Sequence, residues 1–357
     1  MQIGLIGLPQ AGKRTLMHLL TAVDAGTVSS ANSSAIPGMC PVRDPRMDRL
    51  VALYRPAKIT PATIQYWLMP DVTKDSAKNQ ELLKTLLTVD ALAHVVRAFQ
   101  DDTVFHLDGS VDPLRDVNAV QAELILNDLL FVEKRLERIA KELKGRGGVD
   151  RSKEQVLLLK LQAHLNDNRP LRTLSLDVEE QRLLSGTPLL TRKPCVIVLN
   201  VDELTLSDNR LSQEVTQRYA DQHIHLVQLS AKVEEELSQI DDLKERVAFM
   251  KELGIPEPAI DGLTRVSYEA LGLISYFTVG TDEVRAWTVR RGALAPEAGG
   301  VIHSDIERGF IRAEMMKYDD LTAFGSEQAV SSAGRSYLKG KDYRVEDGDI
   351  LSFRFNV

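Results

Sequence analysis

The sequence predicts an α/β protein whose main domain is built on a doubly wound, mostly parallel sheet. Short apolar runs typical of buried strands alternate with segments of helical periodicity from the first residues onward. The stretches between these runs are long enough for the crossover helices that parallel strands require. We expect strands at residues 2–6, 63–69, 91–99, 194–200 and 224–229. We expect crossover helices at residues 13–20, 79–87 and 212–219.

A glycine-rich motif joins the first of these strands to the first helix. It reads Gly7-Leu8-Pro9-Gln10-Ala11-Gly12-Lys13. Glycines let the backbone N–H groups turn inward, the positive end of the helix faces an anion, and the lysine reaches the β- and γ-phosphate oxygens. The motif therefore predicts a P-loop that binds a nucleoside phosphate. The alternative is an accidental glycine-rich turn with the same flanks.

The residue after the lysine does not match the full motif. A serine or threonine is required there, because its hydroxyl coordinates the Mg²⁺ ion that bridges the β- and γ-phosphates. This chain has Arg14, and Thr15 follows one position later. One position on a helix rotates a side chain by about 100°, so Thr15 does not simply replace the missing ligand. Arg14 either adds a positive charge near the phosphates or points outward, and we expect the second.

Two further segments follow predicted strands and are typical of base recognition. Asn200-Val201-Asp202-Glu203 leaves one strand and Ser230-Ala231-Lys232 leaves the next. Loops at the carboxyl ends of parallel strands meet ligands in doubly wound folds. In the usual GTPase scheme the first segment is N-K-x-D, and its last Asp accepts hydrogen bonds from guanine. Glu203 stands at that position with one extra methylene, which is expected to weaken the selection of guanine.

Between the third and fourth strands the sequence predicts an inserted helical hairpin. Six apolar residues are spaced alternately by four and three, as in a heptad seam: Ile125, Leu129, Val132, Leu136, Ile139 and Leu143. Gly145-Arg146-Gly147-Gly148 is expected to end this helix, and Asp150 to cap a second helix that carries Val156, Leu159 and Leu165. Since the seam is satisfied within its own hairpin, we expect a monomer. The hairpin is mildly basic, which indicates either a solvated face or a contact with RNA or an acidic partner.

The last part of the chain changes to a β-rich pattern. A short helix is expected near residues 266–272, followed by strands at 276–280, 284–290, 311–317 and 350–355. This pattern predicts a small separate α+β domain.

Composition limits the function classes. The chain has 357 residues, enough for two or three domains, and a formal net charge of −7. Non-specific DNA binding depends on an excess of Lys and Arg, so we expect no DNA partner and only local contacts with RNA. Its two cysteines, Cys40 and Cys195, are in no metal-ligand or disulfide pattern. No apolar run is long enough for a signal peptide or a membrane span, so we expect a cytoplasmic protein without a membrane partner.

The motifs together resemble the Obg-like ATPases, the YchF subfamily of the Obg-related P-loop GTPases. The resemblance runs almost from end to end and is densest at the C-terminus, where it covers the family's TGS domain. The strings that carry it are Gly4–Pro9 leading into the P-loop, Pro41–Arg46, Ala93–Phe99, Asn200–Glu203, Tyr276–Thr278, Glu283–Thr288, Gly309–Ala313 and Phe353–Val357.

The resemblance implies three domains with stated boundaries. They are a P-loop nucleotide-binding domain at residues 1–116 and 190–272, a coiled-coil hairpin at 117–189, and a β-grasp-like TGS domain at 273–357. It also implies ATP in preference to GTP, a Mg²⁺ ion, and association with the ribosome or RNA through the hairpin and the TGS domain.

The resemblance also implies which residues hold the nucleotide. The phosphates would touch Gly7 and the run Gln10, Ala11, Gly12, Lys13, Arg14 and Thr15. Val201 would lie against the base and Asn200 and Glu203 would frame it. Ser230 and Ala231 would complete the pocket.

The chain departs from the family where hydrolysis takes place. Leu68 stands at the position of the metal-linked Asp, and Asp71 stands at the position of the motif's glycine. The first switch, residues 32–40, lacks the family's threonine-bearing stretch. We therefore expect a nucleotide-binding protein with impaired hydrolysis and no assigned catalytic residue other than a contribution from Lys13. Two alternatives stay open: Thr15 or Asp71 rebuilds the metal site in an active ATPase or GTPase, or the protein is a scaffold that binds no nucleotide.

Overall fold

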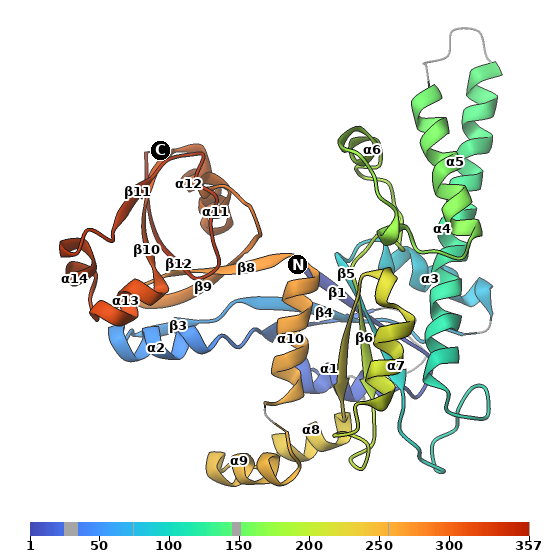
Figure 1. The fold of residues 1–357 in the computed structure, drawn as a ribbon, viewed down its shortest axis with the longest axis horizontal. Coiled ribbons are helices and arrows are strands. Elements are labelled where there is room, and N and C mark those ends of the chain that lie inside the picture. Colours follow the sequence, from blue (N-terminus) through green and yellow to red (C-terminus); the bar gives the residue numbers. More distant parts are fainter. Residues whose placement is uncertain (25–34, 74, 145–150, 256, 357) are drawn as a thin grey trace. The chain divides into compact units, whose positions relative to one another are not determined.

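The computed structural model describes residues 1–24, 35–73, 75–144, 151–255 and 257–356 (Figure 1). The chain forms two compact units. The first consists of Met1–Gly38 and Gln65–Gly262, and the second of Met39–Ile64 and Leu263–Val357. Within the described residues, no helix is both long and apolar enough to cross a bilayer.

The sheet of the first unit has six strands in the order β2-β4-β1-β5-β6-β7. The strands are β1 (Gln2–Ile6), β2 (Ile36–Pro41), β4 (Thr63–Leu68), β5 (Ala91–Arg97), β6 (Cys195–Asn200) and β7 (Ile224–Leu229). The pairings of β1 with β4 and β5, of β5 with β6, and of β6 with β7 are all parallel. The strand order reverses beside β1, so the predicted doubly wound sheet is confirmed, and its switch point lies between β1 and β5.

Every residue of β5 and β6 is buried. Since successive side chains of a strand point to opposite faces, both faces of the sheet are covered there. On one face α3 (Ser76–Leu86) and the start of α4 (Pro113–Lys144) pack on β1 and β5. On the same face α7 (Arg210–Arg218) packs on β6 through Val215. The remaining helices of the unit include α1 (Lys13–Thr21), α8 (Ala231–Ser238) and α9 (Leu243–Glu252). The three crossover helices expected from the sequence are all present.

The hairpin consists of α4 and α5 (Ser152–Asn166), which pack against each other. The short helices η1 (Leu171–Thr173) and α6 (Val178–Leu183) follow it. Ile125, Val132 and Ile139 are buried in the shared core and Leu129 and Leu136 pack against it, which confirms these five positions of the heptad seam of α4. The side chain of Leu143, the sixth position, lies outside the described part of the chain. The predicted helix break at 145–148 and the predicted cap Asp150 lie outside the described residues.

The predicted seam of α5 is wrong in part. Val156 and Leu159 are 68% and 50% exposed, whereas Leu157 and Leu161 are buried. Leu165 is buried as expected. Residues 156–159 are four consecutive apolar residues. Such a run fits several rotations of a helix about its axis, so the sequence did not determine which side chains face α4.

The second unit contains another six-stranded sheet, in the order β11-β10-β12-β8-β9-β3. Its strands are β3 (Lys58–Thr60), β8 (Leu273–Thr278), β9 (Glu283–Arg290), β10 (Phe310–Lys317), β11 (Tyr337–Lys339) and β12 (Asp349–Phe355). Its helices are α2 (Pro45–Tyr54), the end of α10 (Ala259–Ala270), α11 (Ala295–Ile302), α12 (Ser304–Arg308), α13 (Tyr318–Phe324) and α14 (Glu327–Ser332). The four C-terminal strands and the short helix expected from the sequence are present.

Residues 39–64 differ from the expected division, which placed them in the nucleotide-binding domain. They pack with the C-terminal residues instead. Strand β3 pairs in parallel with β9, and Arg46 on α2 forms ion pairs with Asp44 and Asp347. A three-residue edge strand has too little hydrophobic pattern to reveal its partner in the sequence.

The corrected seam of α5 predicts a difference between two leucines. Leu161→Ala removes a fully buried side chain and should lower the free energy of unfolding by about 2–5 kcal/mol. Leu159→Ala acts on a half-exposed side chain and should cost less than about 1 kcal/mol. Urea denaturation of both variants measures the difference, and equal losses would contradict the observed rotation of α5.

Candidate nucleotide-binding site

The phosphate loop connects β1 to α1 at the carboxyl edge of the first sheet, beside β5. Gly7 and Gly12 have φ angles of 150° and 92°, and Gln10 has a φ of 60°. A Cβ atom on Gly7 would lie 2.3 Å from the Val95 carbonyl oxygen, and one on Gly12 would lie 2.3 Å from Asn200 Nδ2. Both positions therefore require glycine on steric grounds as well as for their backbone angles.

The N-terminus of α1 is open to an anion. Its N-cap is Gly12, no side chain caps it, and no acidic residue occupies the first turn. Backbone N–H groups at a helix N-terminus lack partners within the helix and favour negative charge. This arrangement fits a phosphate group.

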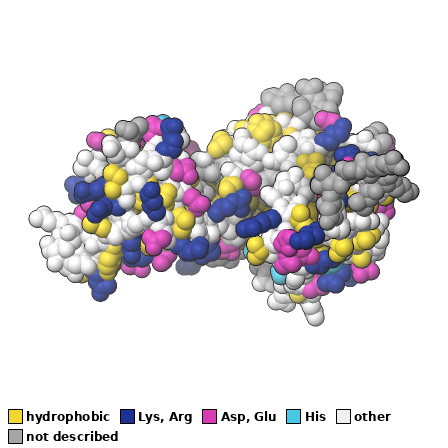
Figure 2. All heavy atoms as spheres, turned by 90° about the horizontal axis from the view of Figure 1, so that it is seen from above, with side chains coloured by type: hydrophobic (Ala, Val, Ile, Leu, Met, Phe, Trp, Pro, Cys, Tyr) yellow, Lys and Arg dark blue, Asp and Glu magenta, His cyan; other side chains and the backbone are white. Residues whose placement is uncertain are grey.

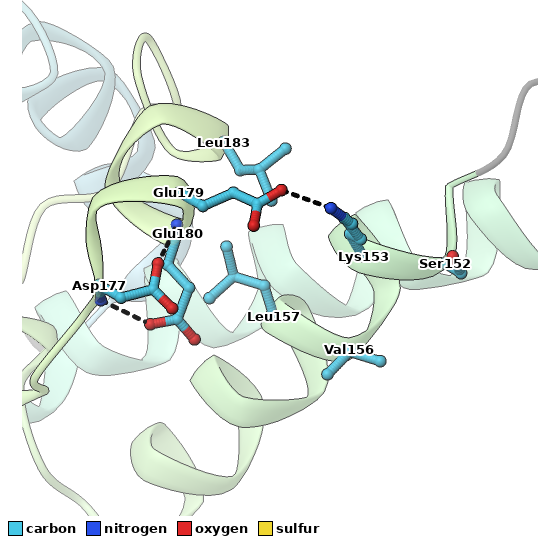
Figure 3. Close-up of a pocket in the computed structure, with 8 residues that line it drawn as sticks. All are labelled: Ser152, Lys153, Val156, Leu157, Asp177, Glu179, Glu180 and Leu183. Carbon is cyan, nitrogen blue, oxygen red and sulfur yellow. Dashed lines mark hydrogen bonds and ion pairs between the residues drawn. The ribbon is translucent and has the colours of Figure 1, made fainter.

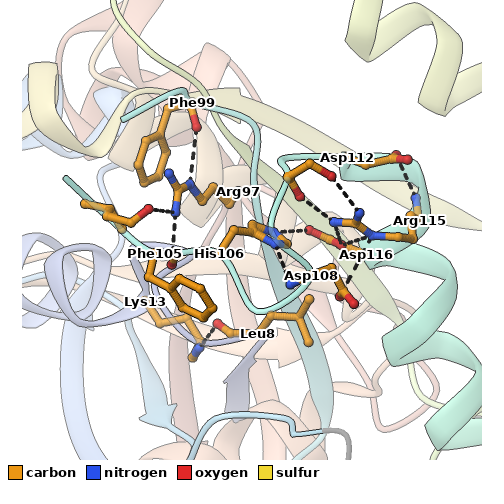
Figure 4. Close-up of polar contacts among 12 residues, drawn as sticks. Leu8, Lys13, Arg97, Phe99, Phe105, His106, Asp108, Asp112, Arg115 and Asp116 are labelled. Atoms are coloured by element: carbon orange, nitrogen blue, oxygen red, sulfur yellow. Dashed lines mark hydrogen bonds and ion pairs between the residues drawn. The ribbon is translucent and has the colours of Figure 1, made fainter. Parts of the chain in front are cut away.

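Lys13 is buried, with only 5% of its surface exposed. Its Nζ donates to the carbonyl oxygens of Gly7 and Leu8 at 2.9 and 2.6 Å, and it forms an ion pair with Asp71 Oδ1 at 2.6 Å. Figure 4 shows the ammonium beside Leu8. Burial lowers the pKa of Lys13, and the carboxylate of Asp71 opposes that shift.

Asn200 connects the two halves of the predicted site. Its Nδ2 donates to the Ala11 carbonyl at 3.0 Å, and its Oδ1 accepts from the Ala231 N–H at 3.0 Å. Ser230 is the N-cap of α8 and accepts from the Val233 N–H. The structure therefore brings the phosphate loop, the end of β6 and the start of α8 together.

Val201 and Glu203, the other two residues expected near the base, form no hydrogen bond with the described residues of the phosphate loop. Val201 is buried, and its N–H donates to the Leu229 carbonyl at 2.8 Å. Glu203 is exposed in the turn that follows β6. Their contacts with a base stay predictions.

Two of the four residues considered for the metal site have side chains that cannot bind a cation. These are Leu68, which is buried at the end of β4, and Arg14, which is exposed as expected. The other two carry oxygen atoms: Thr15 is half-buried, and Asp71 forms an ion pair with Lys13 of the phosphate loop. Among the residues that the structure describes, no cluster of three acidic, histidine or cysteine side chains could hold a metal. Mg²⁺ is commonly held by one or two carboxylates together with phosphates and water, so Asp71 is a suitable donor.

His94 on β5 lies beneath the phosphate loop, and sequence reasoning gave it no role. It is 4% exposed, its Nε2 has no hydrogen-bond partner among the described residues, and its ring lies next to Gly7. Burial, and secondly the charge of Lys13, lowers the pKa of His94 to about 3. The imidazole is thus neutral. A single histidine in an apolar strand gives no sequence signal of this environment.

The loop after β5 is held at the same edge of the sheet. The Arg97 guanidinium donates to the carbonyl oxygens of Phe99, Asp101 and Val104. Beyond it, His106 Nε2 lies 2.9 Å from Asp116 Oδ2 in a buried pair (Figure 4). These contacts join residues that no motif connects, so the sequence could not have indicated them.

The fold and the phosphate loop together define a P-loop protein of the doubly wound α/β class. Comparison with known proteins narrows that class. A family model for the C-terminal domain of YchF GTPases, described as a protein of unknown function (DUF933), matches residues 273–356. The ribosome-binding ATPase YchF of Bacillus subtilis is 39% identical over 99% of both chains. The protein of the same name from Haemophilus influenzae is 37% identical, also over 99% of both chains.

Solved structures agree with these relatives. The YchF GTPase of Schizosaccharomyces pombe has a TM-score of 0.87 and 30% identity, and the match covers 99% of this chain and 97% of the other. A GTP-binding protein from Pyrococcus horikoshii, 19% identical with a TM-score of 0.63 over both whole chains, shares the fold. The chain belongs to the YchF family of Obg-related P-loop GTPases, which confirms the resemblance found in the sequence.

The buried neutral His94 predicts a pH dependence of stability. Its pKa is about 3 in the folded chain and about 6.5 when unfolded, so only the unfolded state binds a proton between these values. Stability is fully present above pH 6.5 and falls as the pH is lowered toward 3. At pH 5 this loss amounts to about 2 kcal/mol.

Urea denaturation at pH 7 and pH 5, on the chain and on His94→Leu, measures this term. The variant should lose about 2 kcal/mol less than the unsubstituted chain between the two pH values. Equal losses would show that the imidazole is not held neutral.

Proposed function

We propose that this chain binds a purine nucleotide, ATP in preference to GTP, and works in association with ribosomes. The observation that carries the proposal is the buried Lys13 ammonium inside a glycine-built loop, next to an uncapped helix N-terminus. The relatives named ribosome-binding ATPase, which match over nearly their whole length, support the ribosomal part.

The proposed contacts follow the geometry of the loop. The phosphates lie on the backbone N–H groups of residues 10–15, and Lys13 donates to them. The base lies between Val201 and the segment Ser230-Ala231, with Asn200 keeping these parts together. Glu203 is exposed and free to turn toward the base.

We propose that hydrolysis is slow compared with other P-loop ATPases. Phosphoryl transfer depends on positioned charge, above all on Mg²⁺ between the β- and γ-phosphates. The side chain of Leu68 cannot bind a cation, and Arg14 carries no hydroxyl. The second candidate is an active ATPase or GTPase whose metal is held by Asp71 or Thr15, and the contact of Asp71 with Lys13 favours it over the scaffold alternative.

Nucleotide titration with Lys13→Ala tests the binding proposal. Loss of the charged donor should weaken the affinity for labelled ATP, ADP and GTP by about 100-fold, since hydrogen bonds to charged groups contribute roughly 1.5–3 kcal/mol. Lys84→Ala is the matched control, because Lys84 is exposed on α3 and should leave affinity unchanged.

The same proteins separate the three candidate functions. Lys13-dependent binding with little Mg²⁺-dependent phosphate release supports slow hydrolysis. A turnover number within the usual range of P-loop ATPases would support the second candidate. Absence of all nucleotide binding would support the third candidate, a scaffold protein that binds no nucleotide.

We propose that the hairpin contacts RNA phosphates on the ribosome through one face of α4. Lys134, Arg138 and Lys141 are exposed there, and none of the three forms an ion pair with another described residue. Their spacings of four and three place them on one side of the helix. Lys134 follows the seam residue Ile125 by nine positions, a rotation of about 180°, so this α4 basic face points away from α5.

The basic side chains on the other side of the hairpin are already neutralised. Lys153 pairs with Glu179 at 2.6 Å and Lys160 with Glu180 at 2.8 Å. Lys153 and Glu179 line a cavity of about 290 Å³ between α5 and α6 (Figure 3). Basic and acidic side chains are interspersed over the surface drawn in Figure 2. The α4 basic face carries three exposed cations and one exposed acid, Glu137, which lies between them. It therefore keeps a surplus of positive charge that an RNA phosphate backbone would meet.

The C-terminal domain is the second proposed contact. On its sheet Arg312 and Arg354 lie opposite each other on β10 and β12. Arg354 already pairs with Glu314, whereas Arg312 is exposed and forms no ion pair with another described residue, so of the two Arg312 is the cation that a phosphate would meet.

Two double variants test the α4 basic face with equal changes of charge. Lys134→Gln with Lys141→Gln should weaken co-sedimentation with ribosomes. It should also reduce the slope of log affinity against log salt by about one to two, because each neutralised phosphate contributes roughly 0.7–0.9. Lys153→Gln with Lys160→Gln should leave the slope unchanged. Equal effects of the two variants would show that only net charge matters.

A further inference from the structure

The ammonium group of Lys13 has no proton left for a phosphate. It carries three protons, and within the described part of the chain it has three acceptors: the Gly7 carbonyl, the Leu8 carbonyl and Asp71 Oδ1. Asp71 is the only one of these three that is negatively charged. Its carboxylate thus occupies the electrostatic position that the proposed site offers to a phosphate oxygen.

The backbone on both sides of Asp71 is fixed to the phosphate loop and its strand. The Met69 N–H donates to the Leu5 carbonyl, and the Val72 N–H donates to the Gly7 carbonyl, both at 3.1 Å. Met69 and Val72 are also buried. A short side chain between two anchored residues has little freedom, so the ion pair is set by the backbone and is not a chance contact of a long surface side chain.

The two partners differ in their access to solvent. The Lys13 side chain is 4% exposed, whereas the Asp71 side chain is 50% exposed. A buried cation without an anion is unfavourable, so Lys13 needs a negative partner. Separation of the ion pair costs less free energy on the Asp71 side, because water or a cation can reach its half-exposed carboxylate.

We propose that Asp71 is a built-in competitor at the phosphate site, which holds Lys13 until a nucleotide displaces it. The inference rests on the nucleotide binding proposed above and adds its regulation. A phosphate that replaces Asp71 at Lys13 brings a second negative charge beside the freed carboxylate. A divalent cation between the two relieves that repulsion, so Asp71 makes nucleotide affinity depend on Mg²⁺.

Titration with labelled ADP and ATP, in EDTA and in Mg²⁺, tests the competitor on Asp71→Asn. This variant removes the charge and keeps the size of the side chain. Removal of one charge-assisted contact should tighten binding in EDTA by about tenfold. The ratio of the affinity in Mg²⁺ to that in EDTA should fall.

Asp221→Asn is the matched control. Asp221 is exposed in the short helix Ala220–Gln222, which precedes the amino end of the edge strand β7, whereas the phosphate loop follows the carboxyl end of the central strand β1. Its loss changes the net charge equally. It should leave both affinities unchanged. Asp71→Ala should behave like Asp71→Asn, which separates the loss of charge from any new contact of the amide.

The outcomes distinguish the two proposals. Lys13-dependent binding that is unchanged or weaker in both Asp71 variants would overturn the competitor and leave nucleotide binding intact. Binding that is detected only after Asp71 is replaced would support the competitor in its strongest form. Absence of binding in every protein, with folding verified by thermal unfolding, would overturn both.

Discussion

The buried ammonium group of Lys13 is the constraint on which the first unit depends. A cation inside a protein is tolerated only when its protons have acceptors and its charge has a partner. The carbonyl groups of Gly7 and Leu8 supply acceptors because the loop turns with a positive φ at Gly7. Asp71 supplies the charge, and its neighbour Val72 bonds to the same glycine. One nitrogen atom thus joins the end of β1, the phosphate loop and the extension of β4.

Asn200 has a comparable role on the other side of the loop. Its amide joins Ala11 to Ala231, residues that the chain separates by more than half its length. The same amide explains the glycine at position 12, since a Cβ there would collide with Nδ2. The phosphate loop, the end of β6 and the start of α8 are therefore parts of one hydrogen-bonded network. A change on either side is expected to affect the other.

The second unit depends on residues far from it in the sequence. The segment between β2 and β4 supplies α2 and β3, and Arg46 pairs with Asp347 some three hundred residues later. Gly348 follows this aspartate with a φ of 86°, and a Cβ there would lie 2.7 Å from Arg46 Nη1. The compact unit that contains residues 273–357 therefore also includes residues 39–64. Expression of that range alone would omit an edge strand and a helix.

The sequence by itself determined the α/β class, five of the six strands of the first sheet, the phosphate loop and the family. These follow from local patterns: apolar runs, helical periodicity and a glycine-lysine motif of fixed spacing. The rotation of α5, the place of residues 39–64, and the contacts of Asp71 and His94 were decided only by tertiary structure. Each depends on residues that are distant in the chain, and on which of several equivalent faces is buried. The sequence shows that Asp71 is displaced from the position of the motif's aspartate, but only the tertiary structure shows that its carboxylate forms an ion pair with Lys13.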